Sequence, residues 1–297
     1  PIISKFRVTK VCGCLVLLLA LSVTLFSNPI RFPARGFAKI LEEGEAQKRL
    51  SEYRNFLSSE TNQTHFHDGF AMRFQLRHMP RRGNEIIQTG SIYGPLLGSG
   101  ISRFSINSEI SGDNDKDYLL KNGKTPKFWK SESIQNVPVP LVTDFITKPI
   151  VEGMNYTPFD LIMPFIFWDA KYEKSGKVAG RPAHIFSFQS PVWIIKEKPE
   201  WKEFTLALDD AYQAPLRVQT LSSSQFLVRT LILRSFKKIG DRWIVKEVDC
   251  RDNKSGSVTR MSITSAAIGI DFDPSFFSPD GLSRRVKIDP QLFLSTD

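Results

Sequence analysis

The chain has 297 residues, of which 41% are hydrophobic and 23 are phenylalanine, which is ample for a sizeable core and for one or two domains. Its formal net charge is +9. The basic residues are scattered rather than clustered, which argues against nucleic-acid binding and favours an anionic membrane, an acidic partner or simple solubility.

The N-terminal segment has the pattern of an export signal. Lys5, Arg7 and Lys10 precede an uncharged run over residues 11–26, which is shorter than the roughly 20 residues that a spanning helix needs. No A-x-A cleavage pattern follows it. Residues 1–28 are therefore predicted to be a signal peptide or an uncleaved N-terminal membrane anchor, and either one places the protein in the periplasm or cell envelope. Cleavage would lower the formal charge from +9 to +6.

The first predicted elements are a helix and a strand. Residues 37–58 carry an apolar stripe at helical spacing, with a kink expected near Gly44, where the sequence is purely polar. Residues 70–77 alternate between an apolar and a polar face, as a half-buried strand does. The apolar face carries four residues: Phe70, Met72, Phe74 and Leu76.

Further extended segments follow this strand. Residues 86–93 and 101–106 have strand patterns, and Asn122-Gly123 is a tight-turn signal between two short apolar segments. Residues 136–148 contain several prolines and are expected to be helical only in part.

A short helix is predicted to begin at Thr157. Thr157 suits the N-cap, Pro158 the first helical position, and Asp160 the position that completes a capping box. Residues 161–168 are apolar almost all round, interrupted by Pro164. Such a helix must be covered either by a sheet or by a ligand.

The region from Trp201 to Ile268 consists of period-2 segments separated by short Gly, Asn, Asp and Ser clusters, which predicts an antiparallel meander. Within it, residues 226–236 are apolar on both faces. Both faces must therefore be covered, either by packed helices or by an apolar trough that is left open for a ligand.

Catalytic and metal-binding patterns are sparse. His65 and His67 lack further ligands at metal spacing and fall in an expected surface loop, and His184 is expected to be an ordinary sheet residue. No nucleophile elbow, phosphate loop, dinucleotide fingerprint or metalloprotease motif occurs. Cys250 lies in an alternating strand and is expected to be a buried apolar side chain. We therefore expect no enzymatic activity, no cofactor and no metal site.

Several short motifs occur in a fixed order along the second half of the chain. They are Gly180-Arg181-Pro182-Ala183, Ala214-Pro215-Leu216-Arg217, Gly240-Asp241-Arg242-Trp243, Thr259-Arg260 and Phe276-Phe277. This order resembles the outer-membrane lipoprotein-sorting proteins of the LolA/LolB-like group, in particular their longer bacterial relatives, over about Gly180 to Leu282. The chain is longer than such a carrier and has an extra region from Gly94 to Pro149.

The resemblance implies a mainly β fold of the α+β type: an unclosed, strongly curved antiparallel β-barrel with helices as a lid over its concave face. Residues 37–288 would form this single domain. By position in the resemblance, Phe159, Leu161, Phe165 and Trp168 would belong to the lid, and the apolar face of residues 70–76 would line the sheet beneath. These eight residues are the predicted lipid-binding set.

The resemblance further implies a function without covalent chemistry. We expect the protein to bind or transfer lipid or lipoprotein acyl chains in the cell envelope, with lipid or a lipidated protein as partner, envelope membrane proteins as further partners, and no nucleic acid. The alternative is a structural or interaction module of the envelope with a fully packed interior and no lipid cargo. The cargo and the oligomeric state are not fixed by the sequence.

Overall fold

The computed structural model describes residues 38–58, 66–107, 116–131, 138–140 and 143–297. The predicted export segment, residues 1–28, lies outside them. The strands, in chain order, are β1 (Phe66–Met79), β2 (Ile86–Gly94), β3 (Ile101–Ile106), β4 (Lys116–Lys121), β5 (Lys127–Ser131), β6 (Pro138–Pro140), β7 (Ala170–Val178), β8 (Arg181–Gln189), β9 (Glu203–Asp209), β10 (Pro215–Leu221), β11 (Leu227–Ile239), β12 (Arg242–Asp252), β13 (Val258–Phe272) and β14 (Leu294–Ser295).

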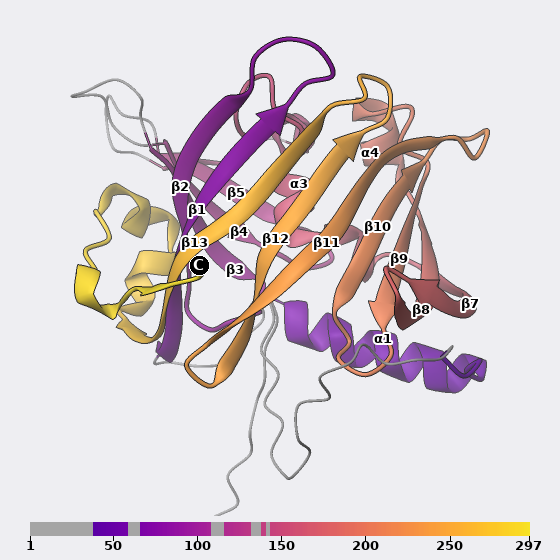
Figure 1. The fold of residues 1–297 in the computed structure, drawn as a ribbon, viewed down its shortest axis with the longest axis horizontal. Helices are drawn as coiled ribbons and strands as arrows, with labels where there is room; N and C mark the ends of the chain where they lie inside the picture. The colour runs from indigo at the N-terminus through magenta and orange to yellow at the C-terminus, as the bar shows by residue number, and fades with distance from the viewer. Residues whose placement is uncertain (1–37, 59–65, 108–115, 132–137, 141–142) are drawn as a thin grey trace, which may run out of the picture.

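These strands build one antiparallel sheet that curves strongly without closing (Figure 1). The order across it is β6-β5-β4-β3-β2-β1-β13-β12-β11-β10-β9-β8-β7, with β14 attached to β13. Within the described residues, the edge strands β6 and β7 do not pair with each other. The predicted unclosed, mainly β barrel is thus confirmed.

The helices are short. They are α1 (Glu43–Leu57), α2 (Thr143–Ile146), α3 (Pro158–Ile162) and α4 (Val192–Glu197), with 3-10 turns η1 (Pro164–Phe167), η2 (Pro274–Phe277), η3 (Pro279–Ser283) and η4 (Pro290–Leu292). Among the described parts of the chain, no helix is long and apolar enough to cross a membrane. In Figure 1, α3 lies against the concave face of the sheet and α1 crosses one end of it.

Two glycines of β2 let the sheet bend sharply beside β1. Gly94 pairs with Phe70 and Gly90 pairs with Phe74. Each phenylalanine ring occupies the space that a side chain on its partner glycine would need, so a Cβ at either position would collide with the ring. Aromatic side chains that cover strand glycines in this way stabilise tightly curved sheets.

The predicted meander is confirmed over β9 to β13, with two differences at its turns. The sequence pattern predicts a turn from Lys237 to Asp241, but residues 237–239 belong to β11. The turn is only Gly240-Asp241, where Gly240 adopts a left-handed φ of 58°. The two-residue connection needs such a glycine. At the other end, β11 begins at Leu227, so Phe226 lies in a turn and is 74% exposed rather than on an apolar strand face.

Helix α1 begins at Glu43, later than predicted, because the acidic stretch forms its first turn. Acidic side chains there interact favourably with the positive end of the helix dipole. Gly44 therefore lies at the helix start, where no kink is needed. The face towards the sheet carries four buried residues: Ala46, Leu50, Tyr53 and Leu57. These residues join the main core and close one end of the barrel.

The C-terminal segment is fastened to a second, smaller core that contains Ile101, Phe272 and Phe277. Arg103 of β3, only 1% exposed, is the centre of this attachment. Its guanidinium donates to the carbonyl oxygens of Gly281 (3.0 Å), Leu282 (3.1 Å) and Arg284 (2.7 Å) and pairs with Asp117 at 3.1 Å.

Replacing Arg103 should therefore destabilise the fold. Arg103→Leu leaves buried carbonyl groups without donors, and we expect the free energy of unfolding to fall by about 3 kcal/mol. Urea unfolding measures this, with Arg251→Leu on the exposed part of β12 as the control, which should change stability by less than about 0.5 kcal/mol. Equal midpoints for the two variants would contradict the role assigned to Arg103.

Candidate functional site

The candidate site is built around residues 155–168, a segment that we call the lid. The capping box predicted at its start is present: Asp160 accepts hydrogen bonds from the backbone N–H of Thr157 (2.8 Å) and from its hydroxyl (2.7 Å). Helix α3 ends at Met163, which adopts a left-handed φ of 47°, and Pro164 then begins η1. The lid is thus two short turns joined by a sharp bend.

An aromatic cluster packs the lid against the sheet. The ring of Phe159 lies 5.0 Å from Phe204 and 5.4 Å from Trp201 between centroids. Phe165 stacks on the same Phe204 at 5.1 Å, nearly parallel, and Trp168 meets it edge-on at 5.7 Å. Aromatic pairs at these separations contribute about 0.5–1.5 kcal/mol each beyond the apolar area they bury.

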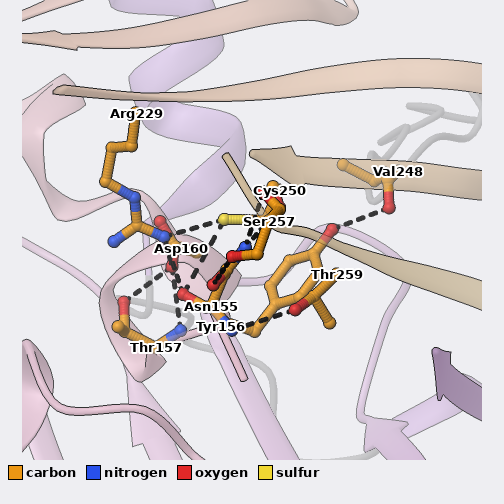
Figure 2. A network of polar contacts seen from close by, with 9 residues as sticks. All are labelled: Asn155, Tyr156, Thr157, Asp160, Arg229, Val248, Cys250, Ser257 and Thr259. Atoms are coloured by element: carbon orange, nitrogen blue, oxygen red, sulfur yellow. Dashed lines mark hydrogen bonds and ion pairs between the residues drawn. The ribbon is translucent and has the colours of Figure 1, made fainter. Parts of the chain in front are cut away.

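A buried ion pair anchors the start of the lid to the sheet (Figure 2). Arg229 of β11 donates to Asp160 at 2.7 Å and to the Asn155 carbonyl at 2.9 Å, and its guanidinium lies 5.0 Å from the Trp201 ring. The same nitrogen approaches the Cys250 sulfur at 2.9 Å. Both partners of the ion pair are almost fully buried.

Strands β12 and β13 complete this anchor. The Asn155 amide nitrogen donates to the Cys250 carbonyl at 3.0 Å, and its backbone N–H donates to the Thr259 hydroxyl at 3.0 Å. The hydroxyl of Tyr156 donates to the Val248 carbonyl at 2.9 Å. The segment before α3 is therefore fixed on three adjacent strands.

The middle and the far end of the lid are also held. Asn122, in the connection between β4 and β5, donates to the carbonyl of Ile162. Arg54 of α1 donates to the carbonyls of Ile166 and Trp168, each at 2.5 Å. Polar contacts thus hold the lid at its start, at Ile162 and at its end, while the side chains of Phe159, Leu161 and Phe165 make apolar contacts with the core.

The buried charges shift the ionisation of this anchor. Burial by itself lowers the pKa of Arg229, but the carboxylate of Asp160 outweighs this, so the guanidinium pKa is raised and the group stays charged. Burial raises the pKa of the Cys250 thiol to about 12, although Arg229 opposes this shift. Arg229 is therefore charged and lies beside a neutral thiol across the physiological pH range.

A cavity of about 110 Å³ lies between the lid and the sheet. Its walls are mostly apolar and come from β2, β3, β4, the lid and β10 to β13, including Ile92, Phe104, Leu120, Leu161, Met163, Val218, Leu231, Val248 and Met261. A hollow of about 50 Å³ shares Leu161 and Met163 with it and reaches α1. Ligand pockets usually measure about 300–1,000 Å³, so the interior is nearly filled as it stands.

The eight predicted lipid-binding residues lie in different places. Leu161 lines the cavity. Phe70, Met72, Phe74 and Leu76 are buried in the main core, and Phe159, Phe165 and Trp168 pack in or against that core with the aromatic cluster. Phe74 stacks on the cavity residue Phe104 at 4.7 Å. Their contact with lipid remains a prediction.

The cavity walls from β10 to β13 and the Arg229–Asp160 pair were missed from the sequence. A weak signal existed for Arg229, because it is one of two arginines within the largely apolar run of residues 226–236. Nothing in the sequence assigned Asp160 to it, since the two are 69 positions apart.

The described histidines give little support for a metal site or for catalysis. His67 belongs to β1 rather than to a loop, and His65 lies outside the described residues. Within the described ranges, no group of three or more His, Cys, Asp or Glu side chains is placed to hold a metal ion. His184 is a buried sheet residue, as expected, bonded to Asp210 at 2.8 Å and Tyr172 at 3.2 Å beneath α1.

Comparison with known proteins relates the fold to solved structures. A family model described only as an uncharacterized protein matches residues 168–284. No curated protein matches. The structure of a domain described as an outer membrane lipoprotein-sorting protein from Vibrio parahaemolyticus is similar with a TM-score of 0.62 at 14% identity, covering 80% of this chain and all of that one.

Two further structures show the same likeness. A DUF1329 family protein from Desulfovibrio piger matches with a TM-score of 0.59 at 12% identity, over 80% of this chain and 98% of its own. A LolA superfamily protein from Nitrosomonas europaea gives 0.56 at 15% identity, over 80% and 99%. The chain thus has the fold of the LolA-like lipoprotein-sorting structures, which confirms the resemblance at the level of architecture.

The Arg229–Asp160 pair should be strongly coupled. We expect Arg229→Met alone to cost about 3–5 kcal/mol, because it leaves Asp160 buried without a cation, and to speed amide exchange in α3 and η1. In a double-mutant cycle with Asp160→Asn, the coupling energy should exceed about 1.5 kcal/mol.

The control cycle is Arg77→Met with Glu85→Gln. That pair has the same 2.7 Å separation but both side chains are about half exposed, so its coupling should stay below about 1 kcal/mol. Equal coupling in the two cycles would show that burial adds nothing to the anchor.

Cys250 should be unreactive in the folded protein. With its pKa raised to about 12, the thiol is almost entirely protonated at pH 8 and is shielded from solvent. Peptide mapping after iodoacetamide treatment should find Cys250 unmodified in the native chain and modified in urea. Rapid modification of the native chain would overturn its assignment as a structural residue.

Proposed function

We propose that the protein is a non-enzymatic carrier or acceptor of acyl chains, from lipid or a lipidated protein, in the periplasm or cell envelope. The observation that carries this proposal is the apolar cavity under a lid whose side chains Phe159, Leu161 and Phe165 pack on the core by apolar contacts. The shared fold with lipoprotein-sorting structures supports it.

Binding would require the lid to move. A cavity of about 110 Å³ is too small for an acyl chain, but displacing Phe159 and Phe165 from the aromatic cluster would extend it along the concave face. Each methylene group of an acyl chain that is buried in their place contributes about 0.8 kcal/mol to the free energy of binding. The lid-closed and lipid-bound states would then differ by only a few kcal/mol, which permits both loading and release.

The small size of the cavity is also the observation that favours the alternative, an envelope interaction module with a packed interior. In that case the aromatic cluster is simply core, and no ligand displaces it. The two functions differ in one measurable property, which is uptake of a soluble acyl probe.

Binding of dansyl-labelled undecanoic acid to the full chain, followed by fluorescence, separates them. Val218→Phe places a ring in the cavity and should weaken binding about tenfold or more. Arg54→Met removes two hydrogen bonds from the lid carbonyls and should strengthen binding, because the lid opens at lower cost.

Ile40→Phe is the matched control for the cavity-filling change, since Ile40 is largely exposed and does not line the cavity. It should bind the probe like the parent chain. If the parent chain and Arg54→Met both fail to take up the probe while remaining folded, the carrier function is wrong and the packed module stands.

A further inference from the structure

An open groove runs along one rim of the barrel, at the end opposite α1. It consists of two adjoining hollows of about 740 and 560 Å³ that share Pro149, Met154, Asn155 and Asp252. We call it the rim groove. Its walls come from the β1–β2 and β12–β13 hairpins, the segment before the lid, the start of β11 and the end of α4, which lie along the upper edge of the sheet in Figure 1.

The rim groove is lined by more cations than anions. Arg81 and Arg82 project from the β1–β2 hairpin, Lys254 from the β12–β13 hairpin, and Lys198 from the end of α4. The acidic lining residues are Asp252 and Glu200. Asp252 already accepts hydrogen bonds from the backbone N–H and hydroxyl of Ser255, so its charge is partly engaged within its own turn.

Large apolar side chains protrude beside these cations. Phe226 is 74% exposed at the base of the β10–β11 turn, directly before the groove residue Leu227. Val192, 82% exposed, begins α4. The β10–β11 turn and the start of α4 are adjacent, because Lys202 donates a backbone hydrogen bond to Leu221 and accepts one from Ser190.

The same combination recurs on the other side of the groove. Ile86 and Ile87 are each about half exposed at the start of β2. Arg81 and Arg82 lie in the hairpin turn that precedes them. Ile86 lies beside Gly153 of the groove wall. Exposed apolar and basic side chains therefore occur together along the rim, from the β1–β2 hairpin to α4.

We propose that this rim is a docking surface for an anionic lipid bilayer. The protruding side chains of Phe226, Val192 and Ile87 would enter the acyl region, while the rim cations contact lipid phosphate groups. Peripheral membrane binding requires this pairing of apolar insertion with basic contacts, since each basic residue near an anionic surface adds only modestly to binding and apolar burial supplies the rest.

The docking surface also borders the lid. Asn155 and Thr157 line the rim groove, while Asp160, three residues later, lines the internal cavity. A docked bilayer would therefore face the anchored start of the lid. The docking proposal does not depend on acyl uptake, because it rests on the rim residues alone.

Phe226→Trp in the full chain reports on insertion directly. The vesicles contain phosphatidylglycerol together with phosphatidylcholine brominated on its acyl chains, and the parent chain supplies the background of its five native tryptophans. We expect bromine to quench the added indole fluorescence at low salt. Leu292→Trp, about half exposed on the C-terminal segment, is the matched control and should not be quenched.

The basic contribution is tested in the same assay. Adding Arg81→Ser and Arg82→Ser to Phe226→Trp should reduce the quenching several-fold, as should salt or vesicles without phosphatidylglycerol. Because residues 11–26 could hold the chain on vesicles by themselves, the readout is the depth of position 226 and not sedimentation.

Two outcomes would overturn the proposal. One is that the added indole stays unquenched on anionic vesicles. If the chain then binds polyglutamate through Arg81 and Arg82, the rim is a docking surface for an acidic protein instead. The other is quenching that does not change with the Arg81→Ser and Arg82→Ser substitutions, with salt or with removal of phosphatidylglycerol. Val218→Phe should leave the quenching unchanged, so failure of acyl uptake and failure of docking are told apart.

Discussion

Burying a carboxylate is unfavourable unless a cation and hydrogen-bond donors meet it, and the lid of this protein depends on that condition. Asp160 caps its own helix and accepts from Arg229, whose guanidinium also reaches the backbone of Asn155. Removing either charge would leave the other buried without a partner of opposite charge. The pair therefore fixes one position of the lid and makes an opening at this end costly.

The sheet provides the complementary property, a concave apolar surface against which the lid packs. Glycines beneath Phe70 and Phe74 allow it to bend, and the aromatic cluster around Phe204 fills most of the bowl. What remains empty is the cavity of about 110 Å³ beside Leu161. Aromatic contacts can be exchanged for acyl chains at little net cost, because both are apolar. This exchange is the physical basis of the proposed function.

The two ends of the barrel differ in chemistry. Helix α1 closes one end with buried side chains and with Arg54, which holds the carbonyls of η1. The opposite rim is open and basic, and apolar side chains such as Phe226 are exposed on it. A ligand arriving from a membrane would thus meet the rim and the start of the lid first, and the closed end would keep it from passing through.

The sequence by itself determined most of the strands, the meander, the capping box at Thr157 and the resemblance to lipoprotein-sorting proteins, because alternation and turn residues act over a few positions. It did not predict β6, which lies in a segment predicted to be partly helical. It also marked Phe159 and Phe165 as residues needing cover. Only the tertiary structure decided what covers them. The curvature of the sheet brings Arg229 to Asp160 and makes Val218 and Met261 walls of the cavity. The start of β11 at Leu227 leaves Phe226 exposed. These depend on contacts between strands far apart in the chain, which local patterns do not encode.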